Sequence, residues 1–146
     1  MNHQNKSICR CMVCGGDVFN IAVPGRRIDF RGIKNLNAPD DLAVPTCTTC
    51  GEELIDSESA QRIDQAMDPL YRAYLRKIAK ESIYEITRAS ISQCDLERAL
   101  GLTQGYITKL KTGKRTPSLA FAVHLAHIAT NPKKNLNQIE KVLTAH

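Results

Sequence analysis

The sequence predicts an α+β protein of two domains, a small N-terminal β unit held by a four-cysteine metal site and an all-α domain of five helices. Two CxxCG motifs enclose a segment in which apolar and polar residues alternate. From residue 57 onward, apolar residues recur at helical spacing between cap signals. A chain of 146 residues is long enough for two such domains.

The composition excludes several classes of protein. With 42% hydrophobic and 24% charged residues, the chain has the balance of a globular protein rather than a disordered one. No apolar run reaches the roughly 18 to 20 residues of a membrane span, and the polar start lacks the apolar core of a signal peptide. We therefore expect a cytoplasmic protein. A Ser-His-Asp signature, a phosphate loop and an H-x-E motif are all missing, so we do not expect an enzyme.

Four of the six cysteines form two matching motifs, Cys11 with Cys14 and Cys47 with Cys50, each followed by glycine. Structural Zn²⁺ sites use four ligands in tetrahedral geometry with Zn–S distances of about 2.3 Å, and a CxxC turn brings two sulfurs to one side. We expect these four cysteines to bind a structural Zn²⁺ that has no open position for water. The alternative is two disulfides or free buried thiols.

The segment between the two motifs reads as strands and turns. Residues 18–23 and 27–31 alternate in polarity, and proline and glycine interrupt them. So small a β unit buries too little apolar surface to be stable alone, and zinc is expected to hold it together. The predicted zinc-binding domain spans residues 1–56 with a disordered lead-in over 1–8. We expect Cys9 to be a spare thiol there.

Helical signals follow. Residues 57–68 are predicted to form a linker helix capped by Ser57, and Asp68 followed by Pro69 predicts the start of another helix over about 69–88. One apolar stripe runs through both pieces and is expected to be core. Its residues are Ile63, Met67, Leu70, Tyr74 and Ile78.

The C-terminal domain, residues 69–146, has the pattern of a helix-turn-helix. Ser92 is expected to cap one short helix, in which Cys94 would be a small buried residue, and Thr103 to cap the next, with a glycine ending each. This spacing is typical of a motif whose second helix enters the DNA major groove, although a short αα-hairpin in any helical bundle shares it. Two further helices are predicted over 118–130 and about 136–143, and Val123 is expected on the apolar face of the first.

The net charge of +5 is concentrated at one end of the chain. Residues 1–56, 57–89 and 90–146 carry −1, +1 and +5, respectively. A basic end on a near-neutral body indicates a nucleic-acid contact surface, with an acidic protein surface as the alternative. Four basic residues with no acid between them fall in the second short helix and the turn that follows it: Lys109, Lys111, Lys114 and Arg115.

Residues 91–126 resemble the Xre/Cro-type helix-turn-helix, whose pattern runs through Gln93, Leu96, Gly101, Ile107, Gly113 and Pro117. Residues 11–56 resemble the zinc domain of the MqsA/YgiT antitoxins, with CxxCG, an FRG stretch at 30–32, and CxxCGEEL. The resemblance implies that the zinc domain binds a toxin, usually an RNA-cleaving enzyme. It also implies that the C-terminal domain dimerises and represses its own operon.

We therefore expect a homodimeric, sequence-specific DNA-binding repressor that is the antitoxin of a type II toxin–antitoxin pair and neutralises an RNase-type toxin. The alternative is a stand-alone Xre-family regulator whose zinc domain docks another protein. One reading helix per subunit implies a palindromic operator. Base contacts are expected from Gln104 and Lys109, and phosphate contacts from the basic turn. The full set of expected DNA contacts is Gln93, Thr103, Gln104, Tyr106, Thr108, Lys109, Lys111, Lys114 and Arg115.

Overall fold

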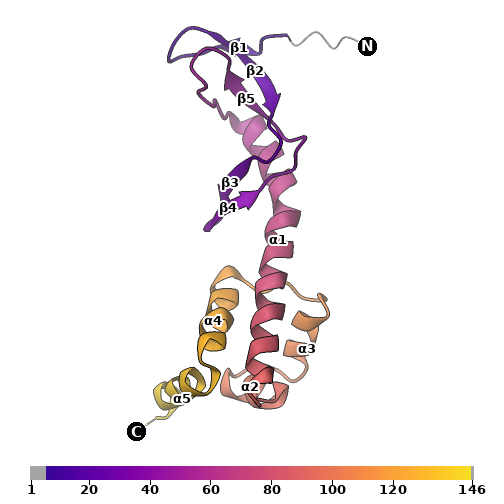
Figure 1. Cartoon of the computed structure of the whole chain (residues 1–146), viewed down its shortest axis with the longest axis vertical. Helices are drawn as coiled ribbons and strands as arrows, with labels where there is room; N and C mark the ends of the chain where they lie inside the picture. Colours follow the sequence, from indigo (N-terminus) through magenta and orange to yellow (C-terminus); the bar gives the residue numbers. More distant parts are fainter. Residues whose placement is uncertain (1–5, 146) are drawn as a thin grey trace. The chain divides into compact units, whose positions relative to one another are not determined.

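The computed structural model describes residues 6–145 and is an α+β structure whose described residues form five strands followed by five helices (Figure 1). The chain divides into two compact units, Met1–Tyr71 and Arg72–His146. Residues 1–5 of the predicted lead-in lie outside the described residues. At the C-terminal end of the predicted lead-in, the backbone N–H of Ile8 donates to the carbonyl of Val18 at 2.8 Å. Ile8 therefore pairs with the strand that contains Val18.

The first unit contains two small antiparallel sheets. Its strands are β1 (Cys9–Arg10), β2 (Asp17–Ala22), β3 (Arg27–Phe30), β4 (Ile33–Asn37) and β5 (Ala43–Cys47). One sheet has the order β1-β2-β5, and the other is a hairpin of β3 and β4. The strands predicted from alternation coincide with β2 and β3. β2 pairs with β5, and Val18 lies opposite Cys47. This register places the first cysteine of the second motif directly beside β2.

The core of the three-stranded sheet is built partly from cysteine. Cys11, Val18 and Cys47 form one buried cluster, against which Leu54 packs. Val44 of β5 is buried as well. Cysteine therefore supplies part of the core of this sheet, and a unit this small buries limited apolar surface.

α1 (Ser57–Arg88) is one continuous helix of 32 residues, and the predicted break at Pro69 is wrong. Its cap also differs from the prediction, because Asp56 rather than Ser57 supplies it. The Asp56 carboxylate accepts the backbone N–H of Ser59 at 2.8 Å, and the Ser59 hydroxyl accepts the N–H of Asp56 at 3.2 Å. This reciprocal pair satisfies two backbone donors at the helix start, as a capping box does.

The hairpin explains why α1 continues through proline. Arg31 pairs with Asp68 at 2.6 Å and lies 4.0 Å from Asp64, and Phe30 packs edge-on against Tyr71 with ring centroids 5.7 Å apart. These contacts therefore hold α1 on both sides of the proline. They favour a continuous helix against the cost of about 3 kcal/mol for a proline in a helix interior. Because the contacts come from residues distant in the sequence, no local sequence signal indicates them.

The second unit packs the last part of α1 against α2 (Gln93–Ala99), α3 (Tyr106–Lys111), α4 (Leu119–Thr130) and α5 (Pro132–Leu143). Ser92 caps α2 as predicted, because its hydroxyl accepts the N–H of Asp95 at 3.1 Å. α5 begins four residues earlier than predicted. The core of this unit is aliphatic: Ala79, Ile83, Ile86, Leu96, Ile107, Leu110, Leu125, Ile128 and Leu136.

Three residues that were expected to be buried are exposed: Tyr74, Cys94 and Val123. On α1 the buried face runs through Leu75 and Ala79, one residue beyond the predicted stripe, so Tyr74 points away from the core. No helix within residues 6–145 combines the length and the apolar character needed to cross a lipid bilayer.

Candidate functional site

The two CxxCG motifs bring four thiols together. The Sγ atoms of Cys11, Cys14, Cys47 and Cys50 all lie within 4.8 Å of one another. Across the two motifs, Cys11 and Cys50 are 3.7 Å apart and Cys14 and Cys47 are 3.4 Å apart, measured between Sγ atoms. Cys9 and Cys94 are exposed and lie outside this cluster.

Each motif forms the same turn. The N–H of Gly15 donates to the carbonyl of Cys11 at 2.8 Å, and the N–H of Gly51 donates to that of Cys47 at 2.9 Å. The two glycines have φ of +76° and +77°, in the left-handed region where side chains are strained. The glycine after each second cysteine therefore closes the turn that aims both sulfurs the same way.

Backbone N–H groups point at the sulfurs, as is typical of thiolate sites. Gly16 donates to Cys14 Sγ and Thr49 donates to Cys47 Sγ, each at 3.4 Å. The backbone N–H of Cys50 also lowers the pKa of the Cys47 thiol to about 6, against the opposing effect of burial. Such hydrogen bonds favour the deprotonated sulfur that binds a metal ion.

The donor set fits tetrahedral metal coordination. Four sulfurs at about 2.3 Å from one ion would lie about 3.8 Å from each other, close to the observed separations. A disulfide requires about 2.05 Å, and all four cysteines are free in this structure. The four thiols could therefore hold a metal ion with no position left for a substrate.

Gly16 is a residue of this centre whose role the sequence did not reveal. A Cβ at this position would lie 2.4 Å from Thr49 Oγ1 and 3.1 Å from Cys47 Sγ. The turn of one motif thus packs directly on the turn of the other. The sequence signal for this role is the second glycine after Cys14, because the first motif has Gly16 where the second motif has Glu52.

The second candidate site is α3 with the turns on either side of it. α3 begins at Tyr106, so the predicted Thr103 cap is wrong. Gly105 takes the N-cap position with φ of 83°, and the N–H of Tyr106 donates to the carbonyl of Thr103 at 3.1 Å. Thr103 and Gln104 therefore lie in the turn before the helix, and both are exposed.

A glutamate from α2 supplies the cap that Gly105 lacks. The carboxylate of Glu97 is buried and accepts the N–H of Ile107 at 3.0 Å, and its backbone carbonyl accepts the N–H of Leu102 at 2.8 Å. A negative charge at a helix N-terminus also complements the helix dipole. Glu97 thus ties the turn and α3 to α2, a role that the sequence alone did not indicate.

The exposed side of α3 consists of polar and basic residues. Because Ile107 and Leu110 are buried, the helical period places Thr108 and Lys109 on the opposite face. The Thr108 hydroxyl donates to the side-chain oxygen of Gln93 at 3.2 Å, so the expected contact residues of α2 and α3 meet.

The two flanks of α3 differ. Tyr106, on one flank, packs edge-on against Phe121 of α4 and lies under the guanidinium of Arg115, which is 5.1 Å from its ring centroid. Lys111 lies on the other flank, beside α1. The remaining basic residue, Lys114, is exposed in the turn after Gly113, whose φ of 73° ends the helix as predicted.

Comparison of the sequence with models of known protein families and with curated proteins gives no match.

Proposed function

We propose that this chain is a sequence-specific DNA-binding transcriptional repressor whose second unit is an Xre/Cro-like helix-turn-helix domain. The observation that carries the proposal is the pairing of α2 with α3, whose outer face bears Thr108 and Lys109 and whose following turn bears Lys114 and Arg115. Neither α3 nor the turn that follows it contains an acidic residue. This outer face suits a partner that is anionic and rich in hydrogen-bond acceptors, as the DNA major groove is.

In the proposed complex, α3 lies in the major groove. Lys109 donates to guanine O6 or N7, and Gln104 reads an adenine edge from the turn before the helix. Lys114 and Arg115 contact phosphates, which fix the position of α3 but carry little sequence information. Gln93 is held by Thr108 and contacts a phosphate at the start of α2.

The experiment compares two lysines of similar exposure. Full-length protein is titrated against a duplex from its own promoter and an unrelated duplex of equal length, at several salt concentrations. Lys109→Ala is expected to lose about 1 to 3 kcal/mol of preference for the promoter. Lys114→Ala is expected to weaken binding to both duplexes by the same factor. It should also reduce the magnitude of the slope of log K against log salt concentration by about 0.9. If the two variants behave identically on both duplexes, α3 is not the helix that recognises the DNA sequence.

A homodimer on a palindromic operator is part of the proposal. α3 has only six residues, so one copy offers few base contacts. Two copies on half-sites about 34 Å apart would double the contacts and supply the specificity that one lacks. Footprinting on the promoter should show two protected half-sites related by a dyad, and a single protected site with a monomeric complex would contradict this part.

We propose that the four-cysteine centre binds Zn²⁺ in a structural role. Four thiolates are a donor set typical of structural zinc, and two of these cysteines, Cys11 and Cys47, belong to the buried cluster of the sheet. Zinc binding to small modules contributes on the order of 10 kcal/mol to folding, which is a large contribution for a unit of this size. Elemental analysis of protein purified without chelator should give one zinc per chain.

We also propose that the first unit docks a protein partner, as in an antitoxin that neutralises an RNase-type toxin. The resemblance of residues 11–56 supports this role. An exposed apolar tip supports docking in general, since Met12 is 93% exposed and Val13 71% exposed between the first two cysteines. The alternative is a stand-alone regulator. Purification from the native operon separates the two, because an antitoxin should be recovered with the product of an adjacent small gene.

A further inference from the structure

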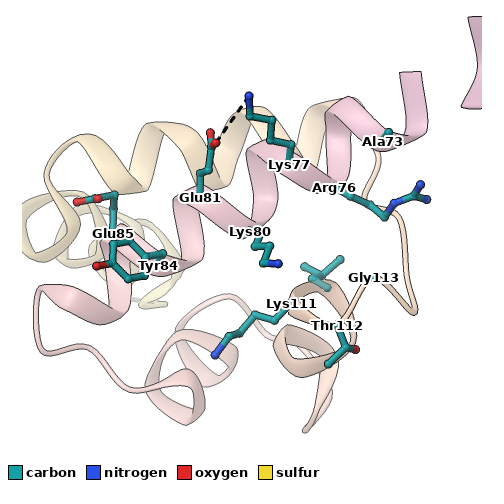
Figure 2. A pocket seen from close by; sticks show the side chains of 11 residues that line it. Ala73, Arg76, Lys77, Lys80, Glu81, Tyr84, Glu85, Lys111, Thr112 and Gly113 are labelled. Carbon is teal, nitrogen blue, oxygen red and sulfur yellow. Dashed lines mark ion pairs between the residues drawn. The ribbon is translucent and has the colours of Figure 1, made fainter. Parts of the chain in front are cut away.

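A groove of about 910 Å³ lies within the second unit, between α1 and the C-terminal end of α3. Figure 2 shows Lys80 pointing from α1 into the space between the two helices, with Lys111 on the α3 side. Arg76 lies at the end of the groove near Gly113. Sequence reasoning placed no function on α1.

The charges around this groove do not cancel. Its two acids already have partners, since Glu81 pairs with Lys77 at 3.9 Å and Glu85 pairs with Arg88 at 3.6 Å. Within residues 6–145, neither Lys80 nor Lys111 forms an ion pair.

The third cation is held in place without being neutralised. Arg76 donates to the hydroxyl of Thr116 at 2.9 Å, and this partner is uncharged. Three uncompensated positive charges therefore surround one groove, and the Thr116 contact orients one of them.

The position of the groove beside α3 indicates its ligand. A helix about 10 to 12 Å wide fills a major groove about 12 Å wide, so the two sugar–phosphate backbones lie along its two flanks. Arg115 lies on the α4 side of α3, over the Tyr106 ring that packs against Phe121, whereas Lys111 is on the flank that faces α1. If one backbone follows the α4 side, the other follows the side where Arg76 and Lys80 extend the basic surface.

We propose that this groove receives the sugar–phosphate backbone of one DNA strand, with Arg76, Lys80 and Lys111 as phosphate contacts. The inference rests on the proposed function and deepens it, because it assigns α1 a part in DNA binding. Phosphate contacts of this kind add affinity without sequence preference.

The test uses full-length, zinc-loaded protein, the promoter duplex and the unrelated duplex. Lys80→Ala is the central variant, because Lys80 is exposed and forms no ion pair within residues 6–145. Lys134→Ala on α5 is the matched control, since it removes the same charge from an exposed residue of the same unit that does not line the groove. Lys80→Ala should weaken binding to both duplexes by the same factor and reduce the magnitude of the salt slope by about 0.9. Lys134→Ala should leave the affinity and the salt slope unchanged. Lys80→Glu should weaken binding further.

The outcomes separate this inference from the proposed function. If Lys109→Ala loses promoter preference but Lys80→Ala matches Lys134→Ala, the groove is not a phosphate site and the function stands. If Lys80→Ala instead abolishes binding of a polyglutamate peptide and leaves the DNA slope unchanged, the groove takes an acidic protein segment and the inference is overturned. If the wild-type chain binds neither duplex, both proposals fail.

Discussion

Gly16 shows how a single hydrogen atom in place of a side chain holds the two cysteine turns together. Gly16→Ala would place its Cβ 2.8 Å from Thr49 Cβ as well as against a cysteine sulfur. Overpacking of this kind costs about 1 to 3 kcal/mol, and here the displaced atoms belong to Thr49 and Cys47 of the four-cysteine centre. We expect a lower melting temperature of the first unit and weaker metal binding, measured by calorimetry and by competition with a chromophoric chelator.

Gly25→Ala is the control for this substitution. Gly25 has φ of +73° and no atom within 4 Å of the position of a Cβ, so only backbone strain is added. A Gly16 variant that binds metal as well as the Gly25 variant would contradict the packing argument.

Glu97 is the residue on which the start of α3 depends. Glu97→Ala leaves the N–H of Ile107 buried without an acceptor, which costs about 1 to 3 kcal/mol. Glu97→Gln keeps an acceptor oxygen and should retain most of the stability that Glu97→Ala loses. We expect faster hydrogen exchange at Ile107 in the alanine variant and near-normal exchange in the glutamine variant. Equal exchange in all three proteins would show that the carboxylate is not the cap.

These residues also mark where sequence reasoning succeeds and where it stops. The cysteine centre could be predicted because Cys11, Cys14 and the glycine after them form a local pattern, repeated at Cys47. The start of α3 could not, because its cap comes from Glu97, ten residues earlier on another helix. Local signals favoured Thr103, which is a good cap in isolation.

At the scale of elements, α1 is the clearest difference between expectation and structure. Asp68 and Pro69 form a typical helix start, yet α1 passes through them because Arg31 and Phe30 of the hairpin contact it on both sides. A sequence contains both possibilities, and tertiary contacts decide between them. The α2 cap at Ser92 was predicted correctly because donor and acceptor lie three residues apart.

Pro69→Ala tests the continuity of α1. Proline inside a helix costs up to about 3 kcal/mol relative to alanine, and Pro69 is exposed, so its replacement removes little packing. We expect a higher melting temperature of the full chain, measured by circular dichroism at 222 nm. If Pro69 were instead the first residue of a separate helix, proline would be favourable there, and the substitution would be neutral or destabilising.

At the scale of the whole molecule, the two units use different means of stabilisation. The buried cluster beside the metal centre contains Cys11, Val18 and Cys47, whereas the second unit has an aliphatic core that shares no residue with it. This division matches the proposed functions, in which the first unit docks a protein partner and the second unit binds DNA through α3. Two domains were expected because cysteine spacing and helical periodicity occupy separate stretches of the sequence. The structure adds that α1 contributes to both units, with the division at Tyr71.

Removal of the metal should therefore unfold one unit and spare the other. With a strong chelator, or in Cys47→Ser, we expect peptides covering β2 and β5 to lose protection from hydrogen exchange. Peptides covering α4 should keep theirs, because their contacts lie within the aliphatic core. Cys9→Ser is the matched control, since Cys9 is an exposed thiol on β1 outside the cluster. Loss of protection in both units at once would mean that the second core depends on the first, and unchanged protection in β2 and β5 would mean that the thiols hold no structural metal.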